Sequence, residues 1–416
     1  MKDLCEITSS KRIYAADYLS GGIPFYRGKE IIEKQSGRVD VSTELFISEE
    51  KFQGIKSKCG APKAGDLLLT SVGTIGIPYI VKEGEIFYFK DGNLTWFRNL
   101  RNMESRFLYY WFLSPSGKAQ LKKCTIGSSQ PALIIVLLKD MEIFLPLLPV
   151  QRKIASILSA YDDLIENNTR RIKILEEMAQ AIYREWFVEF RLPAEVLRTQ
   201  AGAPGVELRK ATPDEQKLTG KDVFPKGWRI NTLGEICNIV MGQSPKSEHY
   251  NETREGLPFH QGVTDFGDRF PTDRVYCTVD NRIAEQGDIL LSVRAPVGRL
   301  NISTKKIVIG RGLCAIRSKY SNQAFVFQQL KQKFHKEDMM GSGTIFKSVT
   351  KDDVHGIEMV LPSELLISEY EIFANPLFRI LENLTEKNTN LRRTRDLLLP
   401  KLISGEVRVE NIEVIT

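Results

Sequence analysis

The chain has 416 residues, enough for two or three domains that each enclose a hydrophobic core. Its 42% hydrophobic and 26% charged residues are typical of soluble globular proteins. No apolar run approaches the roughly 18 residues of a membrane-spanning helix, and the opening residues MKDLCEITSSKR lack the apolar centre of a secretory signal. The six cysteines form no Cys-x-x-Cys pair, which argues against a zinc site and a disulfide framework. We therefore expect a reduced protein of the cytoplasm with no membrane contact.

The net charge of +6 is concentrated in two large segments. Residues 1–147 carry 20 Lys and Arg against 16 Asp and Glu, and residues 222–362 carry 19 against 16. Residues 148–193 are neutral and residues 363–416 are acidic. This modest surplus fits a polyanionic partner and equally fits a solvated surface, so charge alone decides nothing.

The first half of the chain is repeated in the second half. GDLLLTSVGTIG at 65–76 returns as GDILLSVRAPVG at 287–298, an offset of 222, and EIFLP at 142–146 returns as EMVLP at 358–362, an offset of 216. Shorter matches in the same order, such as GIPFYRG with GLPFHQG, indicate a tandem duplication. We therefore divide the chain into a first globular domain (1–147), a first long helix (148–193), a linker (194–221), a second globular domain (222–362), and a second long helix with a C-terminal tail (363–416).

The two globular domains have the pattern of a mixed α/β (α+β) fold. Short runs such as DLLLTSV, EIFYF, DILLSV and KIVIG are rich in strand-forming residues and are bounded by Gly, Asp or Asn. The amphipathic stretches SRFLYYWFLS and QAFVFQQLKQKF predict a helix late in each domain.

The two long segments have apolar residues at alternating spacings of three and four, which predicts a coiled coil. In the first segment, one heptad position is taken by Ile154, Tyr161, Leu175 and Ile182, and the other by Ile157, Leu164 and Met178. In the second segment, one position is taken by Leu381 and Leu402, and the other by Leu377, Leu384, Leu391 and Leu398.

Each long segment also carries an Asn-Thr pair behind a Glu, and the two asparagines, Asn168 and Asn388, are 220 residues apart. On this register both fall at core positions near the middle of a helix. A buried Asn lowers stability but fixes the register and the partner of a coiled coil. Antiparallel and parallel packing can both bring the amides together, and the domain–helix–domain–helix order favours the antiparallel arrangement. In the alternative, both asparagines are exposed or are remnants of the duplication. A helix of about 37 residues spans about 55 Å, so the pair could space two domains along DNA.

Motifs of an enzyme are absent from the sequence. NPLF at 375–378 is similar to the Asn-Pro-Pro-Phe loop of amino-methyltransferases, but it precedes heptad residues and is better explained as a helix-initiating turn. PDEQK at 213–217 is similar to a nuclease site, but it lies in a Gly- and Pro-rich linker. No phosphate-binding loop occurs, and the four histidines lack metal-ligand spacing. We predict no catalytic residue and no metal site.

Several stretches together resemble the specificity (S) subunits of Type I restriction–modification systems. LPLLPVQRKIASILSAYDDLIENNTRRIKILEEMAQAIYREWFVEFR is similar to their central conserved region. FPKGW at 224–228, GDILLSVRAPVG and IGRGLCAI at 309–316 are similar to their target recognition domains. The resemblance implies that each globular domain is a target recognition domain that reads one half of an asymmetric, bipartite sequence in double-stranded DNA, and that the antiparallel coiled coil fixes the spacer.

The resemblance also implies partners. Two methyltransferase (M) subunits would dock on the helical regions, and restriction (R) subunits would complete an adenine DNA methyltransferase and ATP-dependent endonuclease. S-adenosylmethionine, ATP and Mg²⁺ would be bound by those partners and not by this chain. Two other functions remain alternatives: a coiled-coil scaffold whose repeated domains bind protein, and a self-contained methyltransferase, which the missing cofactor motif disfavours.

The sequence departs from the family pattern at one place. FPKGWRINTLGEI introduces the second domain, whereas the first begins directly at MKDLCEI. Either the start of the protein lies upstream, or another segment such as GEVRVENIEV at 405–414 supplies the missing edge.

The expected DNA contacts lie in polar loops of both domains. Arg and Gln suit bidentate reading of guanine and adenine, and Lys suits phosphate, although any single Arg could instead pair with a nearby carboxylate. In the first domain the expected residues are Arg27, Lys29, Lys34, Arg38, Ser71 and Thr74. In the second domain they are Gln243, Ser244, Lys246, His260, Gln261, Arg294, Arg299 and Arg311.

Overall fold

The structure is a computed structural model that describes residues 1–35, 41, 43–127, 130–193, 196, 207–267, 269–334 and 349–409. It divides into two compact units. The first comprises Met1–Thr169 and Lys387–Thr416, and the second comprises Arg170–Glu386. Each unit therefore contains one globular domain, part of the first long helix and part of the second.

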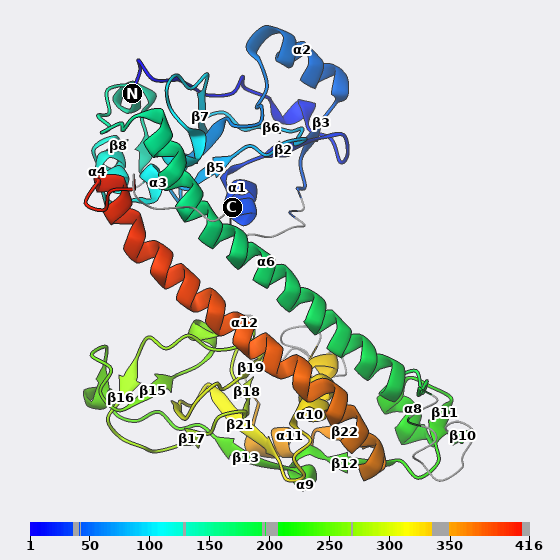
Figure 1. Ribbon diagram of the computed structural model, residues 1–416. Helices are drawn as coiled ribbons and strands as arrows, with labels where there is room; N and C mark the ends of the chain where they lie inside the picture. The colour runs from blue at the N-terminus through cyan, green and yellow to red at the C-terminus, as the bar shows by residue number, and fades with distance from the viewer. Residues whose placement is uncertain are drawn as a thin grey trace. The chain divides into compact units, whose positions relative to one another are not determined.

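The first globular domain is built on two larger sheets and the two-stranded pair β8–β9 (Figure 1). Its elements are β1 (Glu6–Thr8), η1 (Ala15–Asp17), β2 (Ile23–Tyr26), α1 (Gly28–Gln35), β3 (Phe46–Ile47), α2 (Glu49–Cys59), β4 (Leu67–Thr70), β5 (Pro78–Ile80), β6 (Tyr88–Phe89), β7 (Leu94–Arg98), α3 (Ser105–Leu113), α4 (Pro115–Lys123), β8 (Thr125–Ile126), β9 (Ala132–Leu133) and α5 (Ile135–Lys139). An antiparallel sheet has the order β1-β7-β4-β5 and a mixed sheet has the order β3-β2-β6. All four residues of β4 are buried, which explains why three leucines follow one another at its start.

The second globular domain follows the same plan. Its elements are β10 (Leu208–Lys210), α8 (Pro213–Thr219), β11 (Val223–Pro225), β12 (Arg229–Thr232), α9 (Leu233–Ile236), β13 (Cys237–Met241), η2 (Ser247–His249), β14 (Tyr250–Asn251), β15 (Leu257–His260), η3 (Val263–Asp265), β16 (Tyr276–Cys277), β17 (Ile283–Ala284), β18 (Ile289–Ser292), β19 (Leu300–Ile302), β20 (Ile307–Ile309), β21 (Leu313–Ser318), α10 (Gln323–Lys333), α11 (Lys351–His355) and β22 (Glu358–Leu361). The sheet orders are β13-β21-β18-β19 and β14-β16-β15-β20-β17.

The strand pairing confirms the duplication and the mixed α/β fold. In chain order, β13, β18, β19 and β21 take the places of β1, β4, β5 and β7. The parallel pair β2–β6 returns as β15–β20, and the antiparallel pair β2–β3 returns as β15–β16. The helices predicted late in each domain are α3 and α10.

The two globular domains also differ in structure at the edge where their sequences differ. In the second domain β12 pairs antiparallel with β22. Residues 142–146, the repeat of β22, form no strand. Instead Val407 and Val409, from the C-terminal segment named in the sequence analysis, pack in the hydrophobic cluster that contains Ile143 and Leu145. This packing supports a contribution of that segment to the first domain.

The two long helices are α6 (Leu148–Phe187) and α12 (Glu364–Ser404). Ser363 precedes α12 and its Oγ accepts a hydrogen bond from the Leu366 N–H, as expected of a helix cap. Gly405 follows α12 with φ 77°, a left-handed conformation that glycine adopts without steric strain. No helix within the described ranges is both long enough and apolar enough to pass through a membrane.

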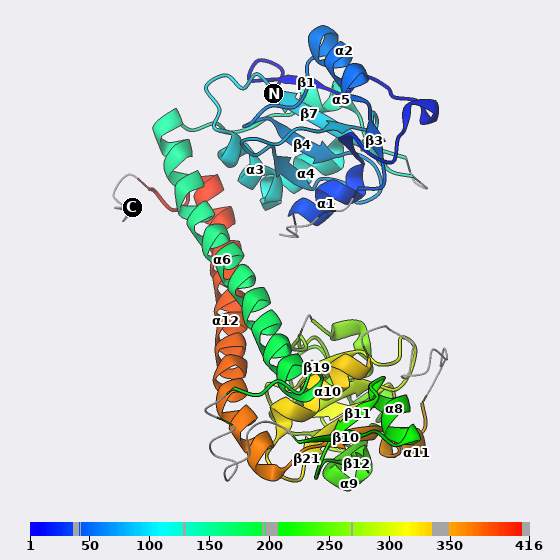
Figure 2. The ribbon, with the colours of Figure 1, turned by 90° about the vertical axis from the view of Figure 1, so that its right-hand side faces the viewer.

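Within each unit, α6 and α12 pack antiparallel (Figure 2). In the first unit Asp162 forms an ion pair with Arg395, and Asn168 donates a hydrogen bond of 2.9 Å from Nδ2 to Asn388 Oδ1. Residues later in α6 thus contact residues earlier in α12, as expected of antiparallel helices. The Asn388 side chain is 3% exposed, and its Nδ2 also donates to Thr169 Oγ1 at 3.2 Å. The amides meet as the sequence predicted, and their role in fixing register stays a prediction.

The second unit continues the same pattern with aromatic residues. The Tyr370 hydroxyl donates to the Ala179 carbonyl oxygen at 3.5 Å, and the rings of Trp186 and Phe373 are 5.6 Å apart. Tyr183 and Tyr370 also contact each other, with ring centroids 6.1 Å apart. These aromatic residues belong to the same hydrophobic cluster as α10 and the four-stranded sheet, apart from Phe373, which is half-exposed.

One predicted heptad position of α6 was wrong. Leu164 and Met178 are 51% and 46% exposed, whereas the neighbouring Ile165 and Ala179 are buried. The second position is occupied one residue later than predicted, by Leu158, Ile165, Ile172, Ala179 and Trp186. In α12 the predicted Leu381, Leu384 and Leu402 are buried. The predicted Leu377, Leu391 and Leu398 are half-buried, and Leu399 is buried in place of Leu398.

The interpretation of NPLF as a helix-initiating turn was also wrong. Asn375–Phe378 lies inside α12, which begins at Glu364. Proline has no backbone N–H, so the Ile372 carbonyl group has no hydrogen-bond donor at Pro376. Because Pro376 is exposed, water can hydrate this carbonyl group.

Candidate nucleic-acid interface

In the second domain, three loops meet at one end of the sheets. The Gly310 N–H donates to the His260 carbonyl oxygen at 2.8 Å, and the Gly312 N–H donates to that of Gln261 at 3.0 Å. The Val293 N–H donates to the Gly312 carbonyl oxygen at 2.9 Å. These bonds join the segment after β15, the β20–β21 loop and the segment after β18.

The glycines around Arg311 are required by this close approach. A Cβ atom at Gly310 would lie 2.7 Å from Gln261 Oε1, and one at Gly312 would lie 2.6 Å from the Gln261 carbonyl oxygen. Any side chain at either position would displace the loops. The sequence GRG therefore presents Arg311 on a narrow, fixed turn.

Polar side chains of this loop cluster contact one another and remain accessible. Ser244 Oγ donates to Gln261 Oε1 at 2.8 Å, and the Arg311 N–H donates to Ser244 Oγ at 3.3 Å. The structure thus brings together three of the predicted contact residues, Ser244, Gln261 and Arg311. Among the predicted contact residues at these loops, those with exposed side chains are Gln243, Lys246, Gln261, Arg294 and Arg311.

Two predicted residues of the second domain are less accessible. Arg299 is half-buried, and its backbone N–H donates to Ser292 Oγ at 2.9 Å. His260 is 0% exposed, with Nε2 3.1 Å from Asp273 Oδ1. Burial alone would raise the pKa of Asp273, but hydrogen bonds from His260 and Lys305 lower it below its usual value. A direct base contact by His260 is therefore not supported, because its side chain lies under the loops.

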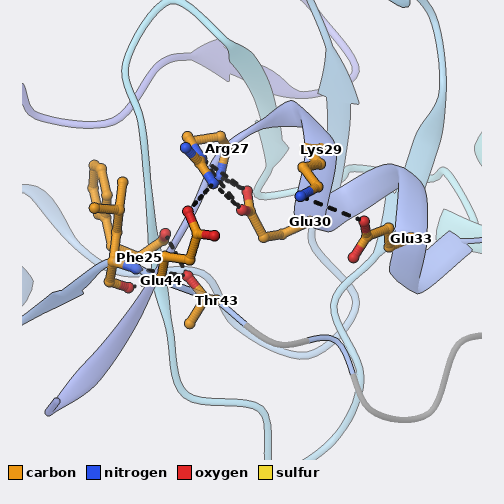
Figure 3. A network of polar contacts seen from close by, with 8 residues as sticks. Phe25, Arg27, Lys29, Glu30, Glu33, Thr43 and Glu44 are labelled. Atoms are coloured by element: carbon orange, nitrogen blue, oxygen red, sulfur yellow. Dashed lines mark hydrogen bonds and ion pairs between the residues drawn. The ribbon is translucent and has the colours of Figure 1, made fainter. Parts of the chain in front are cut away.

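In the first domain, Arg27 is held by carboxylates (Figure 3). Its Nη2 lies 2.6 Å from Glu30 Oε1 and its backbone N–H donates to Glu30 Oε2 at 2.7 Å, while Glu44 lies 3.9 Å away. Burial alone would raise the pKa of Glu30, but the bonds from Arg27 lower it below its ordinary value. Arg27 must exchange or share this pairing to reach DNA.

The lysines of α1 differ in accessibility. Lys34 pairs with Glu85 at 2.7 Å and its Nζ lies 5.1 Å from the centre of the Tyr26 ring, so most of its side chain is covered. The Lys29 side chain is 68% exposed, and its contact with Glu33 is long, at 4.0 Å (Figure 3). Lys29 is therefore better placed than Lys34 for a phosphate. Arg38 lies outside the described residues.

Ser71 and Thr74 occupy the loop after β4. Ser71 is 3% exposed, and its Oγ lies 2.7 Å from Thr95 Oγ1. This buried hydroxyl does not support a direct contact with DNA, and we assign it to loop structure. Thr74 is exposed at the tip of the loop.

Sequence reasoning missed two exposed cations of the first domain. The Lys90 N–H donates to the Tyr26 carbonyl oxygen at 2.8 Å, the same contact that Gly310 makes to His260 in the second domain. Arg12 lies beside this loop, where its Nε donates to Asp91 at 2.7 Å, and its side chain is 67% exposed. An alignment of the two repeats around β6 and β20 could have identified Lys90.

Comparisons with known proteins identify one family over most of the chain. Residues 1–177 and 225–391 match the family described as Type I restriction modification DNA specificity domain. The MjaX type I restriction enzyme specificity subunit of Methanocaldococcus jannaschii is 30% identical, covering 99% of this chain and 93% of that protein. The MjaIX specificity subunit of the same organism is 27% identical over the same shares of both chains.

A solved structure shares the fold. The S subunit of a Type-I restriction–modification system from M. genitalium aligns with a TM-score of 0.58 at 18% identity, covering 96% of this chain and 94% of that one. The family match includes both globular domains and most of both long helices. This chain therefore belongs to the family of type I restriction–modification DNA specificity subunits.

Proposed function

We propose that this chain binds a bipartite DNA sequence, with each globular domain reading one half and the helical pair fixing the unread spacer. The repeated arrangement of the domains carries this proposal. The parallel pair β15–β20 supports the candidate loops of the second domain, and the parallel pair β2–β6 supports the corresponding loops of the first. Exposed Arg311, Gln261 and Gln243 suit base edges, and exposed Lys246 and Lys29 suit phosphates.

The chain would direct chemistry that its partners perform. Two methyltransferase subunits and the restriction subunits would bind S-adenosylmethionine, ATP and Mg²⁺, methylate adenine and cleave DNA. Family membership supports this division of labour.

Mapping methylated adenines tests the proposal. The chain is co-expressed with its neighbouring methyltransferase subunit, and genomic DNA is read by single-molecule sequencing. We expect a bipartite motif with one fixed gap, which disappears when the chain is deleted. A motif without a gap, or one that persists after deletion, would contradict the proposal.

The alternative of a protein-binding scaffold predicts a different response to salt. DNA binding through Lys and Arg releases counterions, so its affinity falls by orders of magnitude between about 50 and 200 mM salt. Docking through apolar surface changes little over that range. Titration of fluorescent duplex carrying the mapped motif into the purified complex distinguishes the two.

A further inference from the structure

Arg269 joins the second globular domain to both long helices. Its side chain is 3% exposed, and Nε donates to Glu176 Oε1 on α6 at 2.7 Å. The guanidinium carbon lies 4.6 Å from the ring centre of Phe378 on α12 and 5.0 Å from that of Phe327 on α10. One side chain thus contacts three helices.

The backbone of Arg269 is tied to the sheet that carries the candidate interface. Its carbonyl oxygen accepts a hydrogen bond of 2.8 Å from the Ile302 N–H, and Asn301 Nδ2 donates to the Gly267 carbonyl oxygen at 2.9 Å. Both Asn301 and Ile302 belong to β19, which pairs with β18, the strand that leads to Arg294. This loop therefore links the helices to the sheet that carries the candidate interface.

The environment of Arg269 favours one orientation of its guanidinium. The two terminal nitrogens donate no hydrogen bond within the described part of the chain, so Glu176 and the two aromatic faces hold the charge. A planar cation between rings with a single carboxylate partner has little freedom to tilt. Lysine cannot reproduce this contact, because its ammonium group is compact and strongly hydrated.

The first domain is attached differently. There, the Tyr110 hydroxyl of α3 donates to Asp162 of α6 at 2.6 Å, and Asp162 also pairs with Arg395 of α12. This link ends on a helix of the domain and involves no buried arginine from a loop between strands. A change at Arg269 therefore affects the second domain alone.

We propose that Arg269 is a positioning residue that fixes the second domain on the helical pair and so restricts the DNA spacer to one length. The proposal rests on the proposed function. Without this contact the domain keeps its base-reading loops and its aromatic packing against the helices. Its orientation on the helices is less restricted, and the complex accepts neighbouring spacer lengths.

The test compares Arg269→Met with wild type in the methylation assay described above. We expect both half-sites to stay unchanged, while methylation spreads from a single spacer to spacers one base pair shorter or longer. Arg274→Met is the matched control, because Arg274 lies in the same loop region, pairs with Asp265 at 3.0 Å and has a side chain that is 59% exposed. The control should keep the single spacer.

Other outcomes separate this inference from the proposed function. Arg269→Met with the wild-type spacer, at equal complex level, would overturn the inference while leaving the bipartite motif intact. If Arg269→Met yields no complex, Glu176→Gln serves instead, because it keeps the arginine and removes only its charged partner. Glu176→Gln should then spread methylation to spacers one base pair shorter or longer, and a single unchanged spacer in that variant would also overturn the inference. A wild-type motif without a gap would contradict the proposed function itself.

Discussion

At the scale of single residues, the second repeat has a carboxyl group at a position where the first repeat has an amide. Gln151 and Glu371 are 220 residues apart, the same offset as Asn168 and Asn388. Gln151 Oε1 accepts from the Glu104 N–H at 2.9 Å, and Nε2 donates to two backbone carbonyl oxygens at 3.0 and 2.8 Å. Glu371 Oε1 likewise accepts from the Phe325 N–H at 2.8 Å, but Oε2 has no hydrogen-bond partner among the described residues.

This difference predicts a pH-dependent stability. Burial raises the pKa of Glu371 from its ordinary value of 4.5 to about 6. As the pH rises, Glu371 ionises in the unfolded chain before it ionises in the folded chain. The folded state therefore has its full stability below pH 4.5 and loses this contribution as the pH rises through 6. The loss is about 2 kcal/mol. We expect Glu371→Gln to remove it, which urea unfolding from about pH 4.5 to 7.5 measures.

The reciprocal variant is the control. Gln151→Glu places a carboxyl group beside two backbone carbonyl oxygens, so it should make the first unit lose stability with rising pH. Identical pH profiles for wild type and Glu371→Gln would contradict the prediction.

The pair of asparagines gives a second prediction at this scale. Asn388→Ala leaves the half-buried Asn168 amide without its partner, and the lost hydrogen bond costs about 0.5–1.5 kcal/mol. The double variant Asn168→Leu, Asn388→Leu replaces both amides with apolar side chains and should be at least as stable as wild type. Thermal unfolding of the single and double variants measures the order, and a double variant less stable than Asn388→Ala would contradict it.

At the scale of elements, apolar pattern predicted both long helices but not every buried face. Ile157 and Leu158 are adjacent, as are Leu164 and Ile165, so two registers fit the same sequence. In the folded chain the later residue of each pair is buried, because tertiary packing covers it. Pattern fixes the period of a helix more reliably than the edge of its buried stripe.

The helical seam can be tested by substitution of neighbouring residues. Leu158 is fully buried, so Leu158→Ala should lower the free energy of unfolding by about 2–5 kcal/mol. Leu164 is half-exposed, so Leu164→Ala should change it by less than about 1 kcal/mol. Chemical denaturation measures both, and equal losses would contradict the observed register.

The candidate site was predictable as a set of loops and not as individual contacts. Repeat matching and Gly-flanked Arg311 located the loops of the second domain. Accessibility depends on neighbours that the sequence does not reveal: Asp273 holds His260 below the loops, and Glu85 covers Lys34 from 51 residues away. Residue type indicates what a side chain can bind, and tertiary packing decides whether it is free to do so.

At the scale of the whole molecule, each long helix contributes residues to both units, so its length is the simplest variable that relates the two domains. One heptad inserted after Leu175 in α6 and another before Leu381 in α12 keeps the seam in register. Seven residues add about 10 Å of helix, which corresponds to about three base pairs. We expect the methylated motif to keep both half-sites and its spacer to lengthen by about three base pairs. The same insertion in α6 alone leaves seven residues unmatched and should abolish methylation. An unchanged spacer in the double insertion would show that the helices do not set the distance at which the two half-sites are read.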